Sequence, residues 1–285
     1  MTCGCGDEDN VRVALVDDRG HHDHHDHHHD QQHPPAHDHA DGTAHDHVHP
    51  PALATETLAI GEAILAKNDH LAEHNRQWLA ARDIMAVNLM SSPGAGKTSL
   101  LERTITDLRG SRSISVIEGD QETRLDAERI QRAGARAVQV NTGAGCHLDA
   151  PMVQRALDAL DPEPGSWVFI ENVGNLVCPA LFDIGEQAKV VIISVTEGDD
   201  KPLKYPHMFS AADLIVVNKT DLLPYVDFDL EAFTRYARSL QPGVLILPLS
   251  VRSGAELDSW YRWLRHPAKS AERRPKSEPE LAKAK

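Results

Sequence analysis

The chain has 285 residues, of which 41% are hydrophobic and 25% charged, and its formal net charge is −14. This acidic balance, without a cluster of Lys and Arg, argues against a nucleic-acid-binding surface, because phosphate backbones bind clustered positive charge. No apolar run of 18 residues and no signal-peptide core appear, and the four cysteines favour reduced thiols, so we expect a cytoplasmic protein that does not interact with membranes.

The N-terminal segment, residues 1–52, is predicted to be disordered and to bind metal. It holds thirteen histidines between His21 and His49, interleaved with Asp and Pro, and almost no large apolar residue after Val16. Such a segment cannot bury enough apolar surface to order itself, whereas imidazoles are good ligands for Ni²⁺, Cu²⁺ and Zn²⁺. A purification tag, the alternative, would be contiguous and terminal. The predicted ligands are His21, His22, His24, His25, His27, His28 and His29, together with Cys3 and Cys5, which could equally be a disordered pair without metal.

Residues 53–265 are predicted to form one α/β domain, and residues 266–285, rich in Pro, Lys and Glu, a disordered tail. Apolar positions at helical spacing predict a helical arm over residues 53–82, which a break near Asn68 and Asp69 could interrupt. The predicted strands that follow are 84–90, 113–118, 136–141, 166–171, 188–195, 213–218 and 243–249, and the predicted helices are 98–109, 122–133, 149–160, 229–240 and 254–264. This alternation predicts a mainly parallel sheet with helices on both faces, which binds ligands at the carboxyl ends of its strands.

A phosphate-binding loop is predicted at Ser91-Ser92-Pro93-Gly94-Ala95-Gly96-Lys97-Thr98, between an apolar strand and a helix. Its glycines let backbone N–H groups turn toward a phosphate, Lys97 can reach the β- and γ-phosphates, and the Thr98 hydroxyl can ligate Mg²⁺. Ser91 stands where the usual pattern has Gly, but the strand-loop-helix context favours a phosphate site over a chance glycine-rich turn. The predicted nucleotide-binding residues here are Gly94, Ala95, Gly96, Lys97, Thr98 and Ser99.

Two acidic residues at the ends of predicted strands suit a hard cation. Asp120 follows strand 113–118, and Glu171 ends strand 166–171 and leads into Asn172-Val173-Gly174. We predict that Asp120 binds Mg²⁺, that Glu171 lies near Mg²⁺ or the attacking water, and that the backbone N–H of Gly174 senses the γ-phosphate. With Lys97, these carboxylates are the predicted catalytic groups; the alternative for each carboxylate is a turn or N-cap acid.

A second metal site is predicted from Cys146, His147 and Cys178. The first two follow a strand and a glycine-rich turn, and Cys178 lies four residues beyond Gly174. Two thiolates and one imidazole suit Ni²⁺ or Zn²⁺, although two buried, inert cysteines and a capping histidine fit the pattern equally well. Because Cys178 shares its segment with the predicted γ-phosphate sensor, movement of Gly174 on hydrolysis would also move a metal ligand.

The base-binding residues are predicted at Asn218-Lys219-Thr220-Asp221, where an apolar strand ends. A carboxylate at Asp221 can accept hydrogen bonds from both N1–H and the exocyclic amine of guanine, whereas adenine offers no such pair of donors. The stem of Lys219 can lie over the base, and Asn218 can brace the loop. Ser250, at the end of strand 243–249, could form the outer wall of the pocket or be a plain N-cap. GTP and GDP are therefore the predicted ligands.

Taken together, these motifs resemble those of the HypB family, GTPases that insert nickel during the maturation of NiFe-hydrogenases. The resemblance covers roughly residues 55–264. It rests on the phosphate-binding loop and on five further segments: Gly119-Asp120-Gln121, Gly145-Cys146-His147-Leu148-Asp149-Ala150, Glu171-Asn172-Val173-Gly174-Asn175-Leu176-Val177-Cys178-Pro179, Lys201-Pro202-Leu203-Lys204-Tyr205-Pro206 and Asn218-Lys219-Thr220-Asp221. This branch of P-loop GTPases commonly begins the phosphate loop with Ser.

The resemblance implies a P-loop NTPase fold and a GTP-dependent homodimer in which Cys146, His147 and Cys178 bind Ni²⁺ or Zn²⁺ at the subunit interface. It implies GTP hydrolysis, with a HypA-type zinc protein and the precursor of the hydrogenase large subunit as partners. Some relatives have a tight nickel site in an N-terminal Cys-x-x-Cys-Gly-Cys motif, of which this chain keeps only Cys3 and Cys5. Other relatives have a His-rich segment, so the resemblance adds nickel storage to insertion.

Two other functions remain open at this point. The related urease accessory GTPase UreG carries a Cys-Pro-His metal motif, which this chain lacks. A metal buffer with a vestigial nucleotide site would be supported only by the histidine-rich segment, and measured GTP turnover would separate it from a GTPase.

Overall fold

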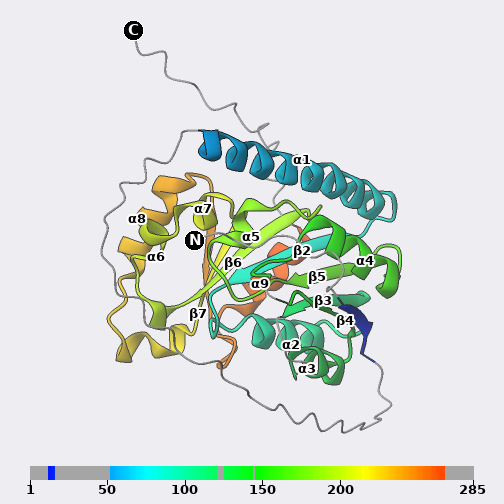
Figure 1. The fold of residues 1–285 in the computed structure, drawn as a ribbon. Coiled ribbons are helices and arrows are strands. Elements are labelled where there is room, and N and C mark those ends of the chain that lie inside the picture. The colour runs from blue at the N-terminus through cyan, green and yellow to red at the C-terminus, as the bar shows by residue number, and fades with distance from the viewer. Residues whose placement is uncertain (1–11, 17–51, 121–124, 144, 267–285) are drawn as a thin grey trace, which may run out of the picture. The chain divides into compact units, whose positions relative to one another are not determined.

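The computed structural model describes residues 12–16, 52–120, 125–143 and 145–266, and its strands form one eight-stranded sheet of order β1-β4-β3-β5-β2-β6-β7-β8 (Figure 1). The strands are β1 (Arg12–Leu15), β2 (Met85–Ser91), β3 (Ile114–Asp120), β4 (Arg136–Asn141), β5 (Trp167–Glu171), β6 (Ala188–Ser194), β7 (Leu214–Asn218) and β8 (Leu245–Pro248). The helices are α1 (Ala52–Ala81), α2 (Lys97–Asp107), α3 (Leu125–Ala133), α4 (Ala150–Leu160), α5 (Cys178–Leu181), α6 (Lys201–Lys204), α7 (Pro206–Ser210), α8 (Leu230–Leu240) and α9 (Leu257–Arg265), with 3₁₀ turns η2 (Val195–Glu197) and η3 (Thr220–Tyr225). Residues 12–16 and those from Lys67 onward belong to the unit that carries the sheet, whereas α1 begins in a separate unit that ends at Ala66.

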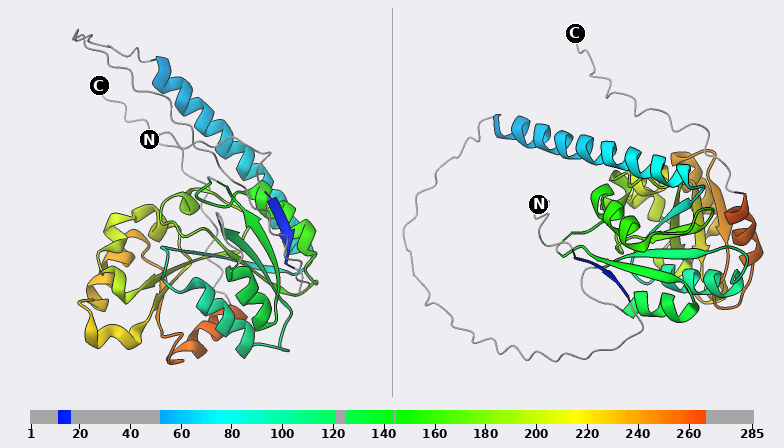
Figure 2. Two further views of the ribbon diagram at one scale, coloured as in Figure 1. Left: turned by 60° about the horizontal axis from the view of Figure 1, so that its bottom comes forward. Right: turned by 90° about the vertical axis from the view of Figure 1, so that its right-hand side faces the viewer.

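Every strand pair except β1 with β4 is parallel, which confirms the predicted mainly parallel sheet. A parallel sheet covered on both faces needs nearly continuous apolar strands, and all of β6 is buried. Its alternate residues enter two cores: Val190 and Ile192 pack with α2, α3 and α9, whereas Val191 and Ile193 pack on the opposite face with α7 and α8. Helices therefore lie on both sides of the sheet, as predicted and as the two views of Figure 2 show.

β1 lies where the sequence predicts a disordered segment, and for residues 12–15 that prediction is wrong. The strand pairs antiparallel with β4, with Val13 opposite Val140, and the side chain of Val13 packs against the core that α4 covers. The side-chain amide of Gln131 donates to the carbonyl of Val16, just past the strand. Four residues with charged neighbours are too few to show a strand period, so pairing with β4 determines this element.

α1 is one continuous helix, so the interruption expected near Asn68 and Asp69 does not occur. Asn68 is held within the helix by bonds to other parts of the chain. Its Nδ2 donates to the carbonyl of Asp183 (2.7 Å), and its Oδ1 accepts from the backbone N of Ala150 (2.9 Å).

No helix in the described ranges is long and apolar enough to span a bilayer.

The short helices α5, α6 and α7 are absent from the sequence-based expectations. Each has four or five residues and a Pro in its first turn, so none can show a helical period. The other expected strands and helices are confirmed within a few residues at their ends. The predicted ligands Cys3, Cys5 and His21 to His29 lie outside the described residues, as do Gln121 and the tail after His266.

Val13→Asp should lower the free energy of unfolding of the sheet-bearing unit by about 1–3 kcal/mol, because it places a charge where an apolar side chain packs on the core. Leu15→Asp is the control: Leu15 is 52% exposed, so its replacement should cost less than about 0.5 kcal/mol. Urea unfolding followed by tryptophan fluorescence measures both. Equal stability of Val13→Asp and the parent chain would mean that β1 does not belong to the cooperative unit.

Candidate functional site

A cleft of about 520 Å³ opens at the carboxyl ends of β2, β3 and β5, beside the N-terminus of α2. This is the edge at which a parallel sheet binds its ligands. The cleft brings together most of the residues that the sequence predicts to contact nucleotide: Gly94, Gly96, Lys97, Thr98, Ser99, Asp120, Glu171, Gly174 and Lys219.

The loop between β2 and α2 has the backbone of a phosphate cradle. Gly94 and Gly96 have positive φ angles of 77° and 102°, which an L side chain would strain. A Cβ on Gly96 would also lie 2.5 Å from Nδ2 of Asn218, which donates to the carbonyl of Ala95 (2.9 Å). The loop and the end of β7 are therefore in close contact.

Lys97 is buried in this loop, and its Nζ donates to Oγ of Ser91 (2.8 Å). The serine that replaces the usual glycine thus supplies an acceptor that orients the lysine. Burial lowers the pKa of Lys97, against the attraction of the nearby Glu171 carboxylate. Nζ of Lys219 donates to the carbonyl of Gly94 (2.7 Å), so the predicted base-binding segment is joined to the phosphate loop.

Two buried glutamates lie side by side in the sheet. Glu118 in β3 and Glu171 in β5 are register partners on adjacent parallel strands, and both line the cleft. Burial, reinforced by the charge of Glu171, raises the pKa of Glu118 to about 9. Burial also raises the pKa of Glu171 to about 7, although Lys97 and a 2.7 Å hydrogen bond from the hydroxyl of Thr98 act to lower it.

The acidic end of the cleft fits Mg²⁺. Oε2 of Glu118 and Oε2 of Glu171 are buried without a hydrogen-bond partner in the described part of the chain, and Asp120 lines the same cleft. With the hydroxyl of Thr98, these are the hard oxygen ligands that Mg²⁺ prefers. A cation here would add to the positive charge of Lys97 and favour the ionised form of these buried carboxylates.

The segment after β5 packs on the phosphate loop. A Cβ on Gly174 would lie 3.0 Å from Cγ of Pro93, so the backbone of Gly174 approaches the loop closely. In the same segment, the buried Oδ1 of Asn172 accepts from the backbone N of Leu148 (3.1 Å), the residue after His147. One segment therefore contacts both the nucleotide cleft and the chain that carries a predicted metal ligand.

Asp221 and Ser250 meet at the predicted base-binding end of the site. The hydroxyl of Ser250 donates to Oδ1 of Asp221 at 2.5 Å, which fixes the carboxylate. Oδ1 of Asn218 accepts from the backbone N of Lys219 (2.7 Å) and of Val251 (3.2 Å). Asn218 thus contacts the loop after β7 and the loop after β8.

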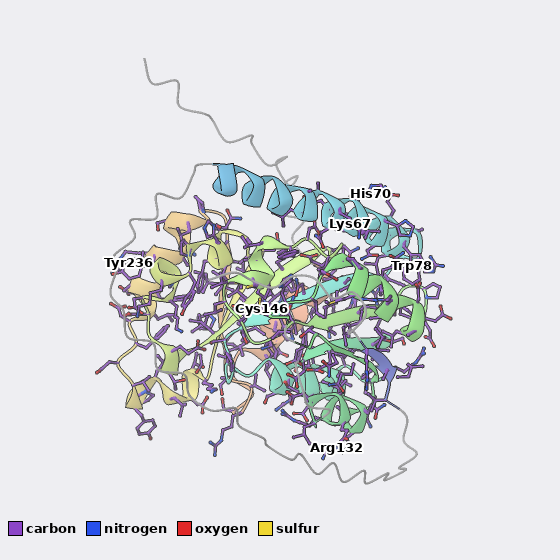
Figure 3. The ribbon with its side chains drawn as sticks, in the orientation of Figure 1. Lys67, His70, Trp78, Arg132, Cys146 and Tyr236 are labelled. Carbon is purple, nitrogen blue, oxygen red and sulfur yellow. The ribbon has the colours of Figure 1, made fainter. Side chains whose placement is uncertain are left out.

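Cys146, His147 and Cys178 form a cluster whose candidate ligand atoms all lie within 4.8 Å of one another; Cys146 is labelled in Figure 3. Sγ of Cys146 lies 3.6 Å from Nδ1 of His147, and the imidazole stacks on Phe182 with 3.8 Å between ring centroids. Burial lowers the pKa of His147, which favours the neutral ring that binds metals. The sulfur and nitrogen donors fit Ni²⁺ or Zn²⁺.

Three charged residues that line the cleft are not among the sequence-based candidates: Glu118, Asp126 and Arg129. An acid inside the apolar run that ends at Asp120 is the signal that could have identified Glu118. Arg129 donates to Asp126 (2.8 Å) and to Glu102 (2.6 Å) and thereby joins α3 to α2. Its helix is rich in charge, so no local signal distinguishes it from a surface arginine.

The amino-acid sequence of this chain is similar to those of known proteins. A family model described as "CobW/HypB/UreG, nucleotide-binding domain" matches residues 85–248. The hydrogenase maturation factor HypB of Rhizobium leguminosarum bv. viciae is 55% identical over 218 residues, which are 76% of this chain and 73% of that protein. The factor of the same name from Escherichia coli (strain K12) is 50% identical over 224 residues, 78% of this chain and 77% of that protein.

Two solved structures have the same fold. The hydrogenase maturation factor HypB from Archaeoglobus fulgidus has a TM-score of 0.66 and 42% sequence identity, and the match covers 70% of this chain and 98% of that one. HypB from Helicobacter pylori, solved in complex with nickel, has a TM-score of 0.67 and 36% identity, and the match covers 70% and 94% of the two chains.

Glu118→Gln should change how stability depends on pH in the protein without nucleotide or divalent cations. The pKa of Glu118 rises from 4.5 to about 9 on folding, so between these values the folded chain keeps a proton that the unfolded chain releases. The free energy of unfolding therefore falls as pH rises through this window, by at most about 1.4 kcal/mol per pH unit for one proton. The substitution should remove this contribution.

Urea unfolding at about pH 5.5, 7 and 8.5 spans that window. Glu163→Gln, at an exposed position before β5, is the matched control and should keep the slope of the parent chain. A slope that is unchanged by Glu118→Gln would contradict a protonated Glu118 in the folded state.

Proposed function

Since the chain belongs to the HypB family of hydrogenase maturation factors, we propose that it is a GTP-hydrolysing nickel metallochaperone. The proposal rests on one observation: the segment from Glu171 to Cys178 takes part in both sites. Thr98 of the phosphate loop donates to Glu171 at its start, and Cys178 joins the sulfur and nitrogen cluster at its end. The identity of 50–55% to hydrogenase factors favours this function over a urease accessory role.

The phosphate loop binds the nucleotide and stabilises the charge that develops when the γ-phosphoryl group is transferred to water. Backbone N–H groups of residues 94–98 and the ammonium of Lys97 act directly on the phosphates, with no covalent intermediate. The backbone N–H of Gly174 senses the γ-phosphate. Thr98, Asp120 and Glu171 would hold Mg²⁺, which would neutralise phosphate charge. We expect a slow switch between the GTP and GDP states.

Ni(II) is the cargo, and Cys146, His147 and Cys178 are its proposed ligands, with Zn²⁺ as the competing ion. The proposed recipient is the large-subunit precursor of NiFe-hydrogenase, and a HypA-type zinc or nickel protein assists the transfer. A GTP-dependent homodimer would bury the cluster between subunits. Two apolar side chains beside Cys178 are suited to such a contact, because Val177 is 50% exposed and Leu181 is 48% exposed. The histidine-rich segment adds nickel storage through its many imidazoles.

Asp221→Asn should convert the chain from a GTPase into a xanthosine-triphosphate hydrolase, because it exchanges acceptor for donor at the base. Guanine presents an amine donor at C2, which the carboxylate accepts, whereas xanthine presents a carbonyl there, which an amide can donate to. The unpaired donors should cost the mutant about 1–3 kcal/mol, or roughly ten- to a hundredfold in GTP affinity. Steady-state hydrolysis of both nucleotides measures the exchange, with the exposed Asp227→Asn as control. A mutant that still prefers GTP would show that Asp221 does not contact the base.

Nickel binding should separate into two sets of sites. Deleting residues 20–50 should remove several Ni²⁺ ions per chain and leave GTP turnover unchanged, because that segment has few apolar residues with which to dock on the domain. In the same deletion, Cys178→Ala should weaken the remaining site and abolish any difference in nickel affinity between GDP and a non-hydrolysable GTP analogue. Equilibrium dialysis and phosphate release measure the two effects. Loss of turnover on deletion, or equal nickel affinity with and without Cys178, would contradict this division.

A further inference from the structure

One face of α1 contacts both chain segments that carry the sulfur and nitrogen cluster. Lys67 and Trp78, labelled in Figure 3, lie in the stretch of the helix concerned, which belongs to the unit that carries the sheet. Asn68 and Asn75 are only 4% and 1% exposed within this stretch. They are about two helical turns apart and so lie on the same face.

Each asparagine bridges the same two segments. Oδ1 of Asn68 accepts from the backbone N of Ala150 (2.9 Å) while its Nδ2 donates to the carbonyl of Asp183 (2.7 Å). Nδ2 of Asn75 donates to the carbonyl of Ala150 (2.9 Å) and to that of Ile184 (3.2 Å). Ala150 begins α4 shortly after Cys146 and His147, whereas Asp183 and Ile184 follow α5, which begins at Cys178. The two asparagines therefore connect the segment of two ligands to the segment of the third.

The loop after α5 has a backbone conformation that lets it pack closely against this helix. Gly185 has a φ of +92°, and a Cβ there would lie 2.7 Å from the carbonyl of Ala72, so only glycine allows the approach. The carboxylate of Asp183 accepts from the backbone N of Gly185 (2.9 Å) and pairs with Nη2 of Arg76 through both oxygens at 2.7 Å. The loop is thus held in one conformation against α1.

We propose that Asn68 and Asn75 are positioning residues of the metal cluster, which hold its two segments at the spacing that brings three ligands together. The geometry of a metal site built from two segments depends on the distance between them. Here the imidazole of His147 spans that distance and stacks on Phe182, the residue before Asp183. The asparagines are not proposed as ligands, since they bond to the backbone of the two segments. Groups that orient ligands from outside typically change metal affinity by about 10- to 100-fold. The inference rests on the proposed metal function of Cys146, His147 and Cys178.

The test uses the full chain with Cys3→Ser and Cys5→Ser. Of the four cysteines, this parent keeps Cys146 and Cys178, so thiolate-to-Co²⁺ charge-transfer absorption reports their cluster and not the histidine-rich segment. Titration with Co²⁺ should give about 10- to 100-fold weaker binding for Asn68→Ala and Asn75→Ala than for the parent, with an altered Co²⁺ ligand-field spectrum. Affinity for a fluorescent GDP analogue should stay unchanged, because the nucleotide cleft does not include these residues.

Two controls separate positioning from general stability. Gln77→Ala alters an exposed residue of α1 that bonds only to Glu73 of the same helix among the contacts described. Trp260→Phe removes a buried 2.9 Å hydrogen bond to Thr104 in the core on the other face of the sheet, so it too loses a buried side-chain hydrogen bond. Both controls should keep the Co²⁺ affinity and spectrum of the parent.

Gly185→Ala tests the same contact from the loop without removing a polar group, and it should also weaken Co²⁺ binding. This variant keeps the inference testable if an asparagine variant does not fold. Unchanged Co²⁺ affinity in the folded asparagine variants and in Gly185→Ala would overturn the inference, as would an equal loss in Trp260→Phe. Absence of the charge-transfer band in the parent would instead overturn the proposed metal site, and the positioning role with it.

Discussion

The parallel pairing of β2, β5 and β3 is the constraint on which the rest of the structure depends, because it ends all three strands at one edge of the sheet. Register then places Glu118 beside Glu171, and α2 begins at the same edge with Lys97. Burial raises the pKa values of both carboxyl groups, that of Glu118 further because of the charge of Glu171, and burial also lowers the pKa of the lysine. A divalent cation that binds here must displace protons, and cation affinity is therefore linked to pH.

Leu148 links that edge to the metal cluster. Its backbone N donates to Asn172 after β5, and its side chain fills the space above Gly119 in β3, where an added Cβ would lie 2.8 Å from its Cδ1. Leu148 directly follows His147, so the ends of two strands that line the nucleotide cleft both contact the neighbour of a candidate ligand. Closely packed contacts tolerate little displacement of either partner, so a shift of either strand end would displace Leu148.

The sequence predicts best those features whose backbone conformation is determined by the residues of one short segment. The phosphate loop and the Asn218 to Asp221 segment belong to this class. The alternation of apolar strands with helices is sufficient to predict the parallel sheet. Features that depend on distant pairing are not predictable in this way: β1 becomes a strand only beside β4, and Glu118 becomes a cleft residue only through its register with Glu171. Asn68 illustrates the limit, since a residue that locally favours a helix break is kept helical by Ala150 and Asp183.

The polar docking of α1 also explains why buried asparagines occur in a helix at all. Asparagine is up to about 0.7 kcal/mol less favourable than alanine in a helix, and an unpaired buried amide costs about 1–3 kcal/mol more. Leucine at these two positions would bury more apolar surface but would remove the donors to Ala150, Asp183 and Ile184. Apolar contacts tolerate sliding, whereas hydrogen bonds fail within a fraction of an ångström. A rotation or one-residue slip of this stretch of α1 would break the bonds of both asparagines together, so this face fixes the helix from Lys67 onward in register as well as in place.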